Sequence, residues 1–237
     1  MLPSAIEPAL RELDATPDPA VVRFDAGAPF AGRVAVLPSA FNPPTAAHLH
    51  LLEVARDVEG VQQTAALLST RNVAKGVFGA SLAHRVGMLL AIHGADPWVA
   101  VLATNAARLA DQARALRAAY PAAGFDFVVG HDTLIRLFDP VYYDDMAADL
   151  TVFFDQHRVI ATNRGEASVE AVQAFVDTQA GGFADRIIVR EIDRHPASLS
   201  STSAREAVAG GLHPVAVASP VADYIRANAL YRGGATP

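Results

Sequence analysis

Apolar positions along the chain fall into two kinds of segment. Short apolar runs are typical of buried strands. The runs assigned to strands are Arg33–Leu37, Thr64–Leu68, Trp98–Leu102, Phe125–Val129, Leu150–Phe154 and Arg186–Val189. Between them lie helical segments, for example one whose Leu49, Leu52 and Ala55 share a face. The predicted helices are Ala5–Leu13, Ala46–Val58, Ser81–Ile92, Ala106–Ala119, Val169–Ala180, Ser203–Ala209 and Val221–Asn228.

This alternation of strands and helices predicts a single α/β domain. Its sheet is expected to be mostly parallel, Rossmann-like and doubly wound, with helices on both faces. We assign the domain to residues 33–237 and treat residues 1–32, which contain Pro17 and Pro19, as an N-terminal extension. Ligands of such sheets bind beyond the carboxyl ends of the strands. The segments Pro38–His48, Gly130–Asp132 and Ser198–Arg205 follow strands or open helices and are therefore the candidates for chemistry.

Composition narrows the classes of function. The net charge of −6 disfavours nucleic-acid binding, which needs a basic face, but a few local cations suffice for a nucleotide. The absence of cysteine excludes disulfides and cysteine nucleophiles. No apolar run approaches the ~20 residues that span a bilayer, and the acidic N-terminus does not resemble a secretory signal. We therefore expect a cytoplasmic enzyme or binding protein without a membrane partner, and a homo-oligomer stays open.

The segment Ser39–His48, SAFNPPTAAH, combines two prolines with a helix start. Thr45 is placed to cap the helix, and His48, three residues later, shares its face. Free N–H groups and the helix dipole attract anions there, and His48 can donate a hydrogen bond to a phosphate oxygen. The alternative is a proline-stiffened turn with a surface histidine.

This segment resembles the phosphate-binding motif of the nucleotidyltransferase superfamily, Gly-Ser-Phe-(Asp/Asn)-Pro followed by (His/Thr)-x-x-His. It is similar in particular to the nicotinamide/nicotinate mononucleotide adenylyltransferases. The matching residues are Phe41, Asn42, Pro43, Thr45 and His48. The resemblance implies that His48 and Thr45 serve catalysis and that Ser39, Ala40, Phe41 and Asn42 bind ATP. Pro38 and Ser39 replace the usual glycines, so we expect a less close approach of the backbone to the phosphates.

The segment Ser198–Arg205, SLSSTSAR, resembles the Ile-Ser-Ser-Thr-x-x-Arg signature of the same family. The resemblance implies that the hydroxyls of Ser201 and Thr202 bind phosphate at a helix start. Arg205, one turn later, would neutralise developing charge as a catalytic residue. The alternative is a serine-rich loop that caps a helix.

The turn Gly130–Asp132 resembles the Gly-x-Asp turn of the family, whose acidic residue binds the ATP ribose. The resemblance thus assigns Gly130 and Asp132 to the ATP site. In the alternative reading, Asp132 caps a helix.

Acceptor binding is implied at several weaker matches. Lys75 and Arg85 resemble a basic loop followed by His-Arg, although such residues are often only solvated, and Arg164 falls where the family has an arginine after a strand. Where the family has Thr-Trp-Glu-Ser, with an aromatic ring that stacks on the nicotinamide, this chain has Thr104 and Asn105. We therefore expect different recognition of the acceptor ring. Tyr142 or Tyr143 is the candidate replacement, unless both only pack a helix.

The implied reaction is adenylyl transfer from ATP to nicotinamide or nicotinate mononucleotide, a step of NAD biosynthesis that releases pyrophosphate. A phosphate dianion needs no general base, so positioning and charge stabilisation carry catalysis. Mg²⁺ would be bound through the substrate phosphates and water, with no metal site made by the protein.

Two alternatives remain at the level of sequence. One is an adenylyl or cytidylyl transferase for another small phosphorylated acceptor. The other is a nucleotide-binding sensor without turnover, which the missing glycines favour and the retained Thr45, His48 and Arg205 oppose. A dehydrogenase is disfavoured, because no Gly-x-Gly-x-x-Gly follows the first strand of the predicted domain.

Overall fold

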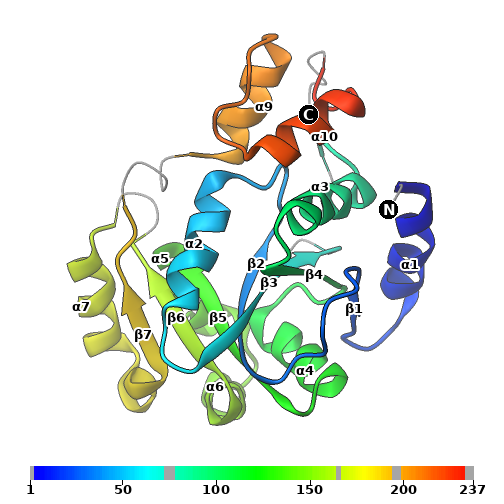
Figure 1. Ribbon diagram of the computed structural model, residues 1–237. Coiled ribbons are helices and arrows are strands. Elements are labelled where there is room, and N and C mark those ends of the chain that lie inside the picture. Colours follow the sequence, from blue (N-terminus) through cyan, green and yellow to red (C-terminus); the bar gives the residue numbers. More distant parts are fainter. Residues whose placement is uncertain (1–2, 72–77, 164–166, 194–198, 233–237) are drawn as a thin grey trace.

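The computed structural model describes residues 3–71, 78–163, 167–193 and 199–232. They form a seven-stranded sheet in the order β1-β4-β3-β2-β5-β6-β7 (Figure 1). The strands are β1 Val21–Arg23, β2 Gly32–Ser39, β3 Val61–Ser69, β4 Val99–Thr104, β5 Ala123–Gly130, β6 Arg158–Thr162 and β7 Ile187–Arg190.

The sheet is parallel from β2 to β7, and only β1 runs antiparallel, beside β4. After the edge strand β1, the chain enters the middle of the sheet at β2, moves outward through β3 to β4, and then crosses to β5 on the other side of β2. This reversal creates a switch point between β2 and β5, the position where sheets of this kind bind ligands. The predicted mostly parallel, Rossmann-like sheet is confirmed.

Helices cover both faces of the sheet (Figure 1). They are α1 Pro3–Ala15, α2 Ala46–Arg56, α3 Leu82–Ala95, α4 Leu109–Ala119, α5 His131–Leu137, α6 Met146–Gln156, α7 Val169–Gln179, α9 Ser201–Ala209 and α10 Ser219–Ala227, with short 3₁₀ helices at Pro140–Tyr142 and Gly181–Arg186. Successive residues of a strand point to opposite faces. Ala35 and Leu37 accordingly join the core under α1, α2, α3 and α10, whereas Val34 and Val36 join the core under α4 to α7.

The predicted strand Leu150–Phe154 is wrong, because these residues lie inside α6. The side chain of Asp145 caps this helix by accepting a hydrogen bond from Ala148 N. Leu150, Phe153 and Phe154 are buried at helical spacing. The strand is the next segment, β6, which the prediction missed, as it missed α5 and β1. A short apolar run has the same pattern in a buried strand and in one face of a helix, so the pattern alone did not decide.

The N-terminal extension is packed into the domain. Helix α1 lies against α3, and β1 adds an edge strand to the sheet. The carboxylate of Asp25 accepts a hydrogen bond from Val101 N at 2.7 Å, which joins the segment after β1 to β4. Among the helices of the described residues, none combines the length and apolar character needed to cross a membrane.

Candidate functional site

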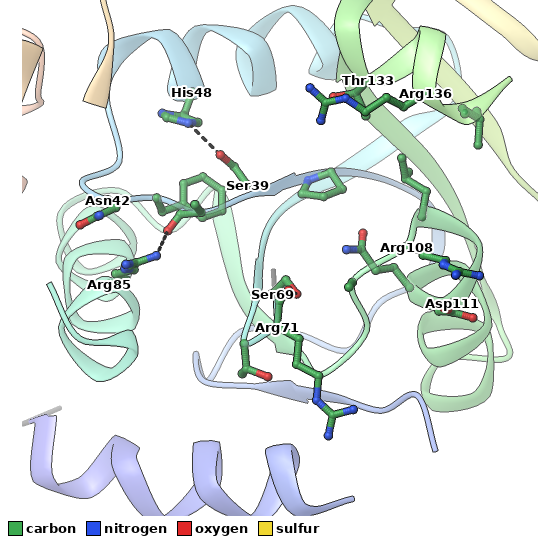
Figure 2. Close-up of a pocket in the computed structure, with 18 of the residues that line it drawn as sticks. Ser39, Asn42, His48, Ser69, Arg71, Arg85, Arg108, Asp111, Thr133 and Arg136 are labelled. Carbon is green, nitrogen blue, oxygen red and sulfur yellow. Dashed lines mark hydrogen bonds between the residues drawn. The ribbon is translucent and has the colours of Figure 1, made fainter. Parts of the chain in front are cut away.

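A cavity of about 730 Å³ lies at the carboxyl ends of the central strands. Its wall includes Ser39 at the end of β2, Ser69 at the end of β3, Thr133 on the helix after β5, and Ser201 at the start of α9. Figure 2 shows Ser39 and His48 on one side of this cavity and Arg108 and Arg136 on the other. The cavity therefore occupies the switch point of the sheet.

His48 is held at the N-terminus of α2 by the residue that caps the helix. Thr45 N donates a hydrogen bond to His48 Nδ1 at 3.0 Å, and Thr45 Oγ1 lies 2.8 Å from the same nitrogen. A ring nitrogen that accepts from an N–H is unprotonated, so the neutral ring carries its proton on Nε2. Nε2 lies 3.0 Å from Ser39 Oγ on the cavity wall (Figure 2). The imidazole is thus oriented with its donor nitrogen at the cavity.

Asn42 is a structural link between loops. Its Nδ2 donates to Phe78 O at 2.8 Å, and its Oδ1 accepts from Ala80 N and from the hydroxyl of Tyr231. The residue before it, Phe41, has φ of 44°, a left-handed backbone uncommon for a residue with a side chain. The Asn42 contacts support this turn from the α3 side and from the C-terminal segment.

The start of α9 docks onto the same loop. Arg205 Nη1 donates to Asn42 O at 2.7 Å, and Nη2 donates to Thr202 Oγ1 at 3.1 Å. Ser201 Oγ donates to Pro43 O at 2.8 Å. All three α9 residues line the cavity together with His48. The structure thus brings together two motifs that lie about 160 positions apart in the sequence.

Arg85 joins loops, whereas the sequence suggested that it binds the acceptor. The residue is 6 % exposed, and its guanidinium donates to three backbone carbonyls, those of Ala40, Phe78 and Ala80. Figure 2 shows its bond to the loop that carries Ser39. Burial lowers the pKa of Arg85, and the nearby Arg205 lowers it further. Arg85 borders the cavity, but its described hydrogen bonds position the loop.

Thr104 and Asn105, which the resemblance assigned to the acceptor site, lie outside the lining of the main cavity. Asn105 is 3 % exposed; its Nδ2 donates to Thr16 O and Asp18 O, and its Oδ1 accepts from Ala20 N. Thr104 Oγ1 donates to Ala20 O at 2.7 Å. Both side chains bond to backbone groups of the N-terminal extension and hold it against the end of β4.

The turn after β5 is also arranged differently from the expectation. Gly130 is the N-cap of α5, so Asp132 is not, and neither residue lines the cavity. The exposed Asp132 forms an ion pair with Arg136 at 3.0 Å. Thr133 and Arg136 from the same helix do line the cavity (Figure 2). The helix thus reaches the site with different residues from those expected.

Both candidate tyrosines border the cavity. The hydroxyl of Tyr143 donates to Leu137 O at 2.6 Å, and burial raises its pKa to about 12. Tyr142 belongs to the 3₁₀ helix Pro140–Tyr142 and is partly exposed. Two further candidates, Lys75 and Arg164, lie outside the described residues.

Several cavity residues were absent from the predicted site. They are Ser69, Arg71, Arg108, Asp111, Gln112, Thr133 and Arg136. Arg108 is the N-cap residue of α4, the helix that follows β4. Its position after a predicted strand was the available signal, because any residue that links a parallel strand to its helix approaches the carboxyl edge of the sheet.

The cavity wall is rich in arginine. Arg71 pairs with Asp14, whereas Arg108 makes no ion pair with any described residue. Within the described parts of the chain, no group of three acidic or histidine side chains is placed to hold a metal ion. The charge of this site therefore suits an anionic ligand.

Comparison with known proteins establishes the fold. No protein-family model and no curated protein matches the chain. Two structures of Plasmodium falciparum nicotinic acid mononucleotide adenylyltransferase, one complexed with APC and one with NaAD, share its fold. Each has 15 % sequence identity, a TM-score of 0.64, and coverage of 84 % of this chain and 97 % of the other. A Vibrio parahaemolyticus protein assigned as a nicotinate-nucleotide adenylyltransferase matches with 15 % identity and a TM-score of 0.50, over 85 % of this chain and 96 % of its own.

Proposed function

We propose that this protein transfers the adenylyl group of ATP to nicotinamide or nicotinate mononucleotide and releases pyrophosphate. The observation that carries the proposal is the docking of α9 onto the Ser39–His48 loop. It places His48, Ser201, Thr202 and Arg205 on one cavity at the switch point of the sheet. The fold shared with nicotinic acid mononucleotide adenylyltransferases supports the same assignment.

The reaction needs little from the protein beyond placement. A phosphate oxygen of the mononucleotide attacks the α-phosphorus of ATP, the bond from that phosphorus to the bridging oxygen breaks, and the electron pair leaves with pyrophosphate. The nucleophile is already an anion, so no side chain has to remove a proton. The hydrogen-bond donors around His48 and the Arg205 guanidinium would stabilise the charge that develops on the phosphates.

The opposite wall of the cavity would hold the acceptor. Arg108 and Arg136 can pair with an anionic group, and Tyr142 presents a ring for an aromatic base. The role that the family gives to an aromatic residue near Asn105 would fall here to Tyr142 or Tyr143.

Mg²⁺ would enter with the triphosphate. Asp111 faces the cavity in an ion pair with Arg114, so it is not a free ligand for a metal. The residues that are present fit a cation bound by phosphate oxygens and water. The ion would neutralise negative charge on the triphosphate.

The deciding experiment measures pyrophosphate release from ATP and Mg²⁺ with a panel of acceptors. The panel contains nicotinamide mononucleotide, nicotinate mononucleotide, phosphopantetheine, and simple sugar and alcohol phosphates, and mass spectrometry identifies the product. We expect a dinucleotide with one or both pyridine mononucleotides. A product with another acceptor would keep adenylyl transfer and change the substrate. ATP binding without product for any acceptor would show a nucleotide-binding sensor.

A further inference from the structure

Ser39 occupies an unusual place in the site. It ends β2, lines the cavity, and its Oγ lies 3.0 Å from His48 Nε2 (Figure 2). The sequence alone suggests that a side chain at this position only obstructs phosphate, because the resembling motif has a glycine there. The structure shows that the hydroxyl instead contacts the nitrogen that serves as donor.

The hydrogen bonds around His48 fix the direction of this contact. His48 Nδ1 accepts from Thr45 N, so the proton of the neutral ring is on Nε2. Ser39 Oγ must then accept from Nε2–H. A hydroxyl that accepts one hydrogen bond still has its own proton to donate, and that donor becomes stronger by polarisation along the chain of bonds. Both groups border the same cavity, so the free hydroxyl proton can reach a ligand there.

We propose that Ser39 binds a phosphate oxygen of the nucleotide and acts as a pair with His48. The imidazole donates from Nε2 to Ser39 Oγ, and Ser39 donates its hydroxyl proton to the phosphate. No bond other than hydrogen bonds forms, and no proton leaves its atom. The proposal rests on the proposed function for the identity of the ligand, and it gives the serine a role that replaces the close backbone approach of a glycine.

The first test compares Ser39→Ala, Ser39→Gly and Ser39→Thr by pyrophosphate release. We expect alanine and glycine to lower turnover about tenfold or more, the usual cost of one hydrogen bond to a charged group. Threonine, which keeps the hydroxyl, should recover most of the activity. The Ser39→Gly variant distinguishes a serine that binds phosphate from a serine that only obstructs it. Turnover of this variant equal to or above that of the unmodified protein would show that Ser39 is an obstruction and would overturn the proposal.

The second test combines Ser39→Ala with His48→Ala. If the two side chains act as a pair, the serine substitution should have little further effect once His48 is gone. Fully additive losses would contradict the pairing. Ser168→Ala, which removes the N-cap hydroxyl of α7 outside the cavity, is the control for loss of a serine hydroxyl.

A third measurement does not depend on turnover. Nitrogen NMR of the imidazole reports its tautomer, and His48→Gln identifies the signal. We expect a protonated Nε2 whose resonance moves on addition of ATP, and a shifted Nε2 resonance in Ser39→Ala. A proton on Nδ1, or no response to ATP in a protein that binds it, would refute the proposal. If ATP moves the signal while no acceptor is adenylylated, the proposed function fails and the Ser39–His48 pair stands. If ATP does not bind at all, both fail.

Discussion

Backbone groups of the protein itself hold the side chains of His48 and Arg205 in place, so their orientation does not require a ligand. Thr45 N fixes the His48 ring, and Asn42 O holds the Arg205 guanidinium. Donors that are already oriented need no reorganisation when charge develops, which is how such groups lower an activation barrier. The two residues should therefore affect the rate more strongly than a flexible surface residue would.

Substitution of His48 by alanine tests this directly. We expect turnover to fall by roughly 10²–10³, the usual loss for one preorganised donor, with a much smaller change in ATP affinity. Steady-state kinetics and calorimetry of ATP binding separate the two effects. Turnover close to that of the unmodified protein would reduce His48 to a residue of the helix start.

Arg205 has two neighbours that a lysine cannot serve together. Its Nη1 and Nη2 donate to different acceptors, Asn42 O and Thr202 Oγ1. We expect Arg205→Ala to weaken ATP binding and to lower turnover, and Arg205→Lys to recover little, because a planar fork and a point charge are not interchangeable. Arg226→Ala, on the exposed side of α10, is the matched control. Full recovery of activity with lysine would show that the two separate donors of the guanidinium are not required.

At the level of elements, Asn105 connects the N-terminal extension to β4. Its amide makes three hydrogen bonds to backbone atoms of that extension. We expect Asn105→Ala to lower the free energy of unfolding by about 2–3 kcal/mol, because the backbone groups that now bond to its amide would be left without a partner. Urea unfolding measures the change, with Asn228→Ala as the control at an exposed amide. Asn105→Trp should destabilise the protein without tightening acceptor binding; tighter binding would restore the stacking role.

Helix α6 shows why sequence patterns failed for one element. The run Leu150–Phe154 contains five residues that suit a strand as well as a helix. What decides is the longer context: Asp145 caps the segment, and the helix continues to Gln156. The helix predicted at Ala46–Val58 could be recognised from the sequence, because both the capping residue Thr45 and the apolar face indicate a helix. The structure gives α2 as Ala46–Arg56.

For the molecule as a whole, buried charge gathers at the end of the sheet away from the cavity. Asp126 on β5 pairs with Arg33 and Arg158. Burial alone raises the pKa of Asp126, but the hydrogen bonds from Arg158 and Arg33 outweigh it, so the pKa lies below its ordinary value. Removal of one arginine would leave the buried carboxylate with a single cationic partner, whereas removal of Asp126 would leave two adjacent arginines without their anion.

His157 lies close to this cluster, and its lowered pKa makes the free energy of unfolding depend on pH. Its ring is packed near Phe125, Phe127 and Phe153, and burial lowers its pKa from 6.5 to about 4. Nearby Arg33 and Arg117 lower this pKa further, while the backbone bond to Phe125 and the charge of Asp126 oppose the shift.

The sign follows from proton binding. Between pH 6.5 and about 4 the unfolded chain binds a proton at His157 that the folded protein excludes, so stability falls as the pH falls through this window. We expect a loss of about 2–3 kcal/mol between about pH 7 and about pH 4.5 from this residue. His157→Gln should flatten that part of the urea-unfolding profile, and the exposed His213→Gln should not. Equal profiles for all three proteins would contradict the assignment.

The sequence by itself determined the class of fold and the identity of the main motifs. Local pattern is sufficient for this, because parallel strands separated by helices leave few arrangements, and Thr45 with His48 share a helix face by spacing alone. The resemblance of the Ser39–His48 and Ser198–Arg205 segments was also visible without coordinates.

Only the tertiary structure decided which side chains face the cavity. Thr104 and Asn105 had suitable positions in the sequence, but they lie outside the cavity lining and bond to the backbone of the N-terminal extension. Arg85 borders the cavity, but its guanidinium bonds to backbone carbonyls of neighbouring loops. A buried polar group must find a partner, and that partner can come from anywhere in the chain. Arg108 shows the opposite case: its position after a predicted strand placed it near the carboxyl edge of the sheet, but whether its side chain lines the cavity depends on how α4 packs.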